Sequence, residues 1–157
     1  MTLLKEIESR PPRVKRLGLT AAVALSSFGW AAMFGGGVMD CIIAFFVALL
    51  SQAIAFMLDK AGMRSFVSTL FGSFLGTILP MLLHMATGML VVDATVAACL
   101  MPMLPGLAMT NAVQDTLRGD MVSGISSATS ALLTASMIAG GALAGSAFFR
   151  LLTGGVL

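Results

Sequence analysis

Charged residues are scarce in this chain. Only 10% of its 157 residues are Asp, Glu, Lys or Arg, there is no tyrosine and a single tryptophan, and 58% of the residues are hydrophobic. A soluble domain needs roughly a quarter of its residues charged to cover its surface. The composition therefore excludes an ordinary soluble domain. It predicts an integral membrane protein whose main solvent is the lipid bilayer, with no nucleic-acid partner.

Residues that bind metals or catalyse reactions are also few. Cys41 and Cys99 fall inside apolar stretches without the spacing of metal ligands, so we interpret them as small core residues. His84 is the only histidine, and no nucleophile or paired carboxylate accompanies it. The sequence thus predicts no catalytic residues, no metal and no cofactor, and it argues against an enzyme.

Five apolar segments are long enough to cross a bilayer as helices. They cover residues 17–34, 38–58, 65–85, 90–112 and 122–149. Because their connections are short, we expect a compact all-α bundle of about five transmembrane helices with antiparallel neighbours. The chain then divides into a basic N-terminal segment, 1–16, and a transmembrane domain, 17–157.

The basic residues predict an orientation. Eight of the nine Lys and Arg residues fall on the side of the N-terminus, and only Arg150 falls on the other side. Such residues gather on the cytoplasmic side of membrane proteins. We therefore expect a multi-pass protein of the plasma (inner) membrane with its N-terminus in the cytoplasm. The alternative, that the first segment is a cleaved signal peptide ending near "AVA" at 22–24, fits poorly with the long charged region before it.

Two glycine pairs predict close helix contacts. "GSFLG" and "GALAG" each place two glycines four residues apart, at Gly72 and Gly76 and at Gly141 and Gly145. Glycines with this spacing lie on one face of a helix and allow a neighbouring backbone to approach.

The fourth apolar segment contains the helix breakers. Pro102 and the Pro105-Gly106 pair must interrupt or kink this helix, since proline lacks a backbone donor and clashes with the preceding turn. Irregular backbone is tolerated at membrane depth only where protein or water satisfies it. We therefore predict a discontinuous helix that lines a substrate path. Its second half should begin near Gly106 and could present its positive dipole end to an anionic group.

Polar residues follow the break. Asn111 and Asp115 are four residues apart and share a helix face, and Thr110 precedes them. Alternatively, Asp115 pairs with Arg118 at the cytoplasmic end of the helix. We assign to the substrate path or its coupling the residues Asp40, Pro105, Gly106, Thr110, Asn111 and Asp115.

Capping explains other positions. Gly119 is expected just past the end of the fourth helix, and Asp120 is expected as the N-cap of the fifth. Asp40 follows three consecutive glycines and has two interpretations that the sequence leaves open. It lies in a solvated turn or caps the second helix, or it faces a cavity that the glycine backbone lines.

The same residues resemble a known family. "PGLAMTNAVQDTLRGDMVSG" is similar to the signature of the threonine/serine exporters, which reads proline-glycine, threonine-asparagine, aspartate, glycine-aspartate and serine-glycine. These elements fall on Pro105, Gly106, Thr110, Asn111, Asp115, Gly119, Asp120, Ser123 and Gly124. "FGGGVMDCIIAFF" resembles the family's glycine-rich turn and aspartate, at Asp40. The resemblance extends over nearly the whole chain.

This resemblance implies a secondary transporter that exports threonine and serine, or a dicarboxylate, with the proton gradient as driving force and Asp115 or Asp40 as the protonated carboxylate. It also implies a partner, either a second, smaller membrane component or a further copy of the chain. Family members usually carry a soluble hydrolase-like segment before the first helix, and "LKEIESRPPRVKR" resembles its tail. The chain is then a truncated product, a separately encoded membrane half, or a product of a misplaced start.

Another interpretation is a non-transporting membrane subunit that needs a partner to form any path. A holin-type pore former is a weaker alternative, because such proteins need no broken helix that bears an aspartate.

Overall fold

The regular structure is helical throughout the part of the chain that the computed structural model describes, residues 16–62 and 65–154. The elements are α2 (Arg16–Met33), α3 (Val38–Lys60), α4 (Ser65–Thr87), α5 (Val92–Leu100), the short 3₁₀ helix η1 (Met101–Met103), α6 (Gly106–Leu117) and α7 (Met121–Thr153). The predicted all-α bundle is confirmed, and α5 and α6 together form the predicted fourth helix. The basic segment predicted at 1–16 lies outside the described residues, apart from Arg16.

Length and composition identify the helices that can cross a membrane. Among the described residues, α3, α4 and α7 are long and apolar enough. The bent pair of α5–η1 and α6 counts as a fourth span, and the apolar part of α2, Gly18–Met33, is shorter than a usual span. The protein is therefore an integral membrane protein with a helical transmembrane domain.

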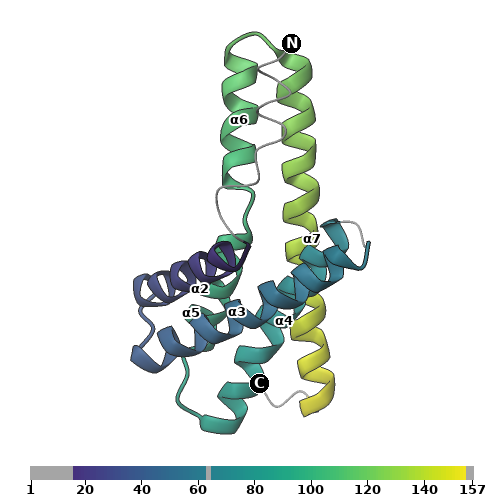
Figure 1. The fold of residues 1–157 in the computed structure, drawn as a ribbon. Coiled ribbons are helices and arrows are strands. Elements are labelled where there is room, and N and C mark those ends of the chain that lie inside the picture. The colour runs from purple at the N-terminus through teal and green to yellow at the C-terminus, as the bar shows by residue number, and fades with distance from the viewer. Residues whose placement is uncertain (1–15, 63–64, 155–157) are drawn as a thin grey trace.

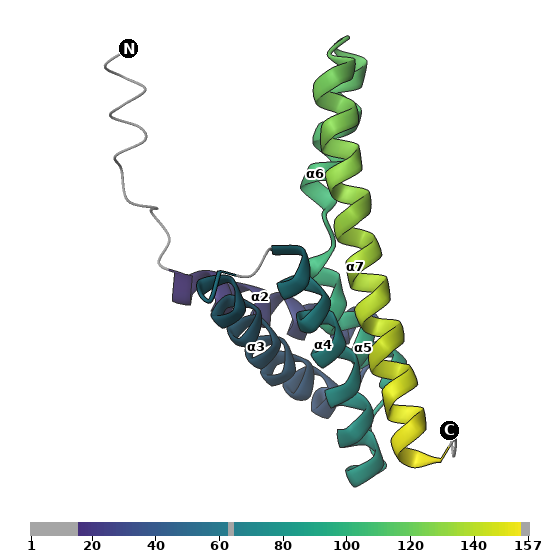
Figure 2. The ribbon, with the colours of Figure 1, turned by 90° about the vertical axis from the view of Figure 1, so that its right-hand side faces the viewer.

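The helices form a body and a projecting hairpin. In the body, α4 lies between the α2–α3 pair and α7, and α5 packs against α2, α3 and α4 (Figures 1 and 2). The hairpin consists of α6 and the first half of α7, which extend together beyond the body (Figure 1). The 33 residues of α7 span about 50 Å at 1.5 Å per residue. This length exceeds the roughly 30 Å hydrocarbon core of a bilayer by about the length of α6.

The glycine pair of α7 brings this helix against α4, as predicted. A Cβ atom at Gly141 would fall well inside 3.0 Å of both the Ser73 side chain and the Leu70 carbonyl oxygen. One at Gly145 would lie 2.9 Å from the Phe74 carbonyl oxygen. Because two of these neighbours are backbone atoms, a side chain at either position would push the helices apart.

The glycine pair of α4 faces α5 and the 3₁₀ helix. A Cβ atom at Gly72 would lie 2.7 Å from the Met103 Cε, and one at Gly76 would lie 3.5 Å from the Cys99 Cβ. The two cysteines are free and buried, as expected of core residues. They belong to a core cluster formed by Ala31, Cys41, Ala44, Val47, Ala98 and Cys99.

Candidate functional site

The break between α5 and α6 lies at the predicted position. The helix tightens into η1, Leu104 is extended with φ −63° and ψ 135°, and α6 begins at Gly106 after Pro105. The axes of the two halves differ by 50°. Pro105 occupies the N-cap of α6 without a side-chain hydrogen bond to the helix, while the Gly106 N–H donates to the Leu104 carbonyl oxygen at 2.8 Å. Proline and glycine thus produce the interruption locally.

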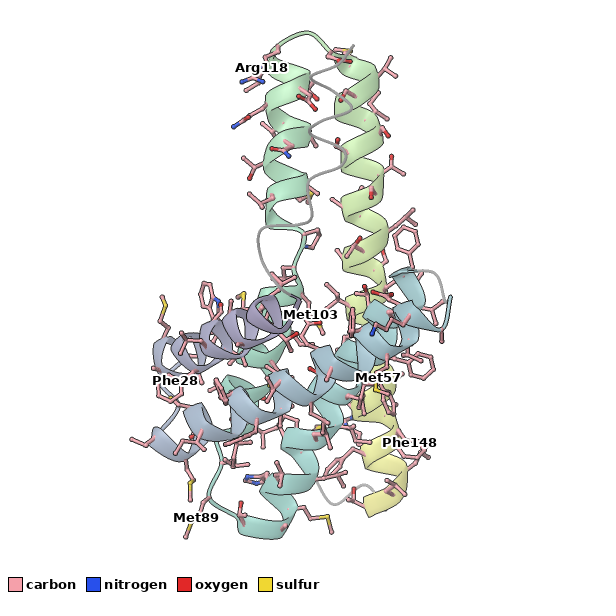
Figure 3. All side chains as sticks on the ribbon, in the orientation of Figure 1. Phe28, Met57, Met89, Met103, Arg118 and Phe148 are labelled. Atoms are coloured by element: carbon pink, nitrogen blue, oxygen red, sulfur yellow. The ribbon has the colours of Figure 1, made fainter. Side chains whose placement is uncertain are left out.

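The polar residues of α6 lie on the hairpin. Thr110 and Asn111 are exposed, and the Thr110 hydroxyl donates to the Gly106 carbonyl oxygen at 3.0 Å. Asp115 is half-buried between α6 and α7, where its Oδ2 accepts a hydrogen bond from the Ser123 hydroxyl at 3.0 Å. In the described residues Asp115 forms this side-chain contact and no ion pair with Arg118, which lies near the tip of the hairpin (Figure 3).

The turn between α6 and α7 contains both residues assigned to capping. Gly119 has φ +89°, a conformation that glycine adopts at little cost. Asp120 is the N-cap of α7, and its side chain accepts a hydrogen bond from the Ser123 N–H at 3.0 Å. Gly124 lets α6 approach, because a Cβ atom there would lie 3.0 Å from the Ala112 carbonyl oxygen.

Asp40 connects two helices at the opposite end of α5. It is 2% exposed, in the first turn of α3. Its Oδ2 accepts from the Gly37 N–H at 2.8 Å, and its Oδ1 accepts from the Val91 N–H and from the Thr95 hydroxyl, each at 2.9 Å. The carboxylate therefore joins the start of α3 to the start of α5. The whole of α5 separates it from Thr110, Asn111 and Asp115, so the predicted site residues do not form one cluster.

We expect Asp40→Ala to lower the free energy of unfolding by about 2–3 kcal/mol, because it removes a buried carboxylate that accepts from three donors, among them the hydroxyl of the buried Thr95. Asp93→Ala is the matched control, since Asp93 is an exposed aspartate in the first turn of α5. Its loss should cost about 0.5 kcal/mol. Thermal unfolding in detergent, followed by circular dichroism, measures both variants. Equal losses would contradict a clamping role for Asp40.

A polar pocket that the sequence did not indicate borders the break. It has a volume of about 240 Å³ and is lined by Gln52, Ala55, Asp59, Ser68, Thr69, Pro102 and Met103. A second pocket of about 220 Å³ shares its Gln52, Ala55 and Asp59 and extends to Leu19, Thr20 and Phe56. Met103 marks the position of the break beside α2 and α3 (Figure 3). Residues from α2, α3, α4 and the interrupted helix thus line two adjoining pockets that share the polar side chains of Gln52 and Asp59.

Asp59 is the charged residue of this region. It is exposed near the end of α3, and its Oδ1 accepts a short hydrogen bond from the hydroxyl of the buried Ser68 on α4. The neighbouring Lys60 ammonium lies 4.9 Å from the centre of the Phe56 ring. The one available sequence signal was that Gln52 and Asp59 are seven residues apart, which places them on the same face of a helix.

The fold and this site define the class of protein: a helical membrane protein whose interrupted helix borders a polar pocket, the arrangement in which many secondary transporters bind substrate. A sequence profile for one family, described as "Putative threonine/serine exporter", matches residues 1–149. The chain belongs to this family, whose description is that of a transporter.

A curated relative agrees with this membership. The chain is 26% identical over 140 residues to a "Probable threonine/serine exporter" of Mycobacterium tuberculosis. The match covers 87% of this chain and 26% of the relative, so the chain spans about a quarter of that protein's length. No solved structure matches it significantly.

Proposed function

We propose that this chain exports small polar metabolites, threonine and serine first among them, along a path that passes the break between α5 and α6. The observation that carries the proposal is the polar pocket at this break, in a membrane domain that is otherwise largely apolar. A zwitterionic substrate needs polar partners where it leaves water, and the pocket offers hydroxyl, amide and carboxylate groups. The family membership supports the same substrates.

Export is driven by the proton gradient in this proposal, with Asp115 as the carboxylate that is protonated and deprotonated. Asp40 is less suited to this role, because its oxygens already accept three hydrogen bonds that join α3 to α5. Asp115 accepts one hydroxyl hydrogen bond and lies nine residues beyond Gly106, about 13 Å along α6. With the predicted orientation, this position is the cytoplasmic mouth of the path.

Efflux from vesicles tests the proposal. The purified chain is reconstituted into liposomes loaded with radiolabelled threonine, serine or succinate, with and without an imposed pH gradient. We expect threonine and serine to leave faster than from protein-free liposomes, and the gradient to accelerate this efflux. If the gradient has no effect on efflux, proton coupling is excluded.

A second candidate function is a membrane subunit that forms a path only with a partner chain, either a second membrane subunit or another copy. The observation that favours it is the length of the relative, of which this chain covers 26%. Efflux from liposomes that contain this chain alone would remove a requirement for a different subunit. Crosslinking in the same liposomes would show whether copies associate.

The proposed site of action is the plasma (inner) membrane, with the N-terminus and the loop between α3 and α4 in the cytoplasm. Reporter fusions placed in that loop and after α7 test the orientation. We expect the loop fusion to be active only as a cytoplasmic reporter, and the fusion after α7 only as an external one. If the loop between α3 and α4 proved to be external, the cytoplasmic and external ends of every helix would be exchanged.

A further inference from the structure

We propose that Asp59 binds the ammonium group of the transported molecule, so that the pocket selects amino acids over dicarboxylates. This inference rests on the proposed function, since it assigns a role within the same pocket.

The composition of the pocket favours a positive group. Of the described residues that line the two adjoining pockets, Asp59 alone carries a charge, and it lines both. The other polar residues are neutral: Thr20, Gln52, Ser68 and Thr69. A carboxylate attracts an ammonium group and repels the carboxylates of a substrate. Water near an exposed aspartate screens this preference but does not reverse it.

Among the described residues, one Asp59 oxygen accepts a side-chain hydrogen bond and the other has no partner. The Ser68 hydroxyl binds Oδ1 and fixes the side chain against α4. Oδ2 bonds to no other residue within the described ranges, and the neighbouring Lys60 lies over the Phe56 ring. A ligand ammonium with three donors can therefore bind Oδ2 and retain donors for neutral acceptors of the pocket, such as the Gln52 amide oxygen.

The pocket lies at the end of the helices from which an exporter would take up its substrate. Asp59 is the penultimate residue of α3, and Ser68 and Thr69 lie in the first turns of α4. Lys60 is the last residue of α3 and Arg64 lies in the loop that follows, and the distribution of basic residues predicts that this loop is cytoplasmic. The site then lies on the side from which an exporter takes its substrate.

The test is binding to the purified full chain in detergent, measured by isothermal titration calorimetry. The ligands are L-threonine, the hydroxy acid in which a hydroxyl replaces its amino group, succinate and sodium chloride. Asp59→Asn keeps the size of the side chain and an acceptor for Ser68 but removes the charge. Ser68→Ala is the matched control, because it removes the hydrogen bond and keeps the charge.

We expect the wild type to bind threonine at least about tenfold more tightly than the hydroxy acid or succinate. Asp59→Asn should lose this preference, and Ser68→Ala should retain it. Three results would each overturn the ammonium assignment. Asp59→Asn could bind threonine as tightly as the wild type does. The wild type could bind succinate as tightly as threonine, or it could bind sodium but not threonine. Lack of threonine efflux from wild-type liposomes would instead overturn the proposed function, so the two failures are distinguishable.

Discussion

Replacing Gly141 with alanine should separate α4 from α7 and lower the free energy of unfolding by about 3 kcal/mol, the upper range for overpacking a core. The added methyl group would collide with the Ser73 hydroxyl and with the Leu70 carbonyl oxygen. The hydroxyl can rotate away, but the carbonyl belongs to the backbone of α4 and moves only with the helix. The contact between α4 and α7 is the most extensive between any two helices described, so its loss affects the whole body.

Gly140 provides the matched control for this experiment. It precedes Gly141 in the same helix, yet a Cβ atom there would meet no heavy atom within 4 Å. Gly140→Ala should therefore be neutral or stabilise the helix by up to about 1 kcal/mol, the usual difference in helix propensity. Thermal unfolding in detergent and the yield of folded protein measure both variants. If they behave alike, close approach at Gly141 is not what holds α4 and α7 together.

The sequence predicted those features that arise within one helix. Apolar length predicted the helices, because a chain in lipid must satisfy its backbone groups internally. Pro105 and Gly106 predicted the break, because proline and glycine act on their own backbone. The glycine pair in α7 predicted a close contact, although its partner helix became known only from the structure.

The sequence alone could not predict contacts between residues that are far apart along the chain. Two of the three hydrogen-bond partners of Asp40 lie 51 and 55 positions further along the chain, and their identity depends on how α5 packs against α3. The polar pocket is a similar case, because it brings Asp59 and Ser68 together with the break at Met103. Apart from its position seven residues after Gln52, nothing in the local pattern distinguishes Asp59 from an ordinary charged residue at the end of a helix.

Asp115→Asn should insert and fold as the wild type does, yet lose gradient-driven efflux of threonine. Asparagine preserves the size of the side chain and can still accept the hydrogen bond from the Ser123 hydroxyl, which lies 3.0 Å away. It cannot be protonated and deprotonated, so a proton gradient has no group at this position to act on. Efflux driven by a threonine gradient alone, without a pH gradient, should continue.

Ser123→Ala separates this charge effect from the contact itself. It removes the hydroxyl that donates to Asp115 and keeps the Asp115 carboxylate, while the Ser123 backbone N–H can still donate to the capping side chain of Asp120. A coupling role for Asp115 predicts that Ser123→Ala retains gradient-driven efflux and that Asp115→Asn does not. A purely structural role predicts that both variants fold slightly less well and transport normally per folded molecule. The deciding measurement is efflux divided by the amount of folded protein in the membrane. If Asp115→Asn shows the same gradient-driven efflux as the wild type, Asp115 is not the coupling carboxylate.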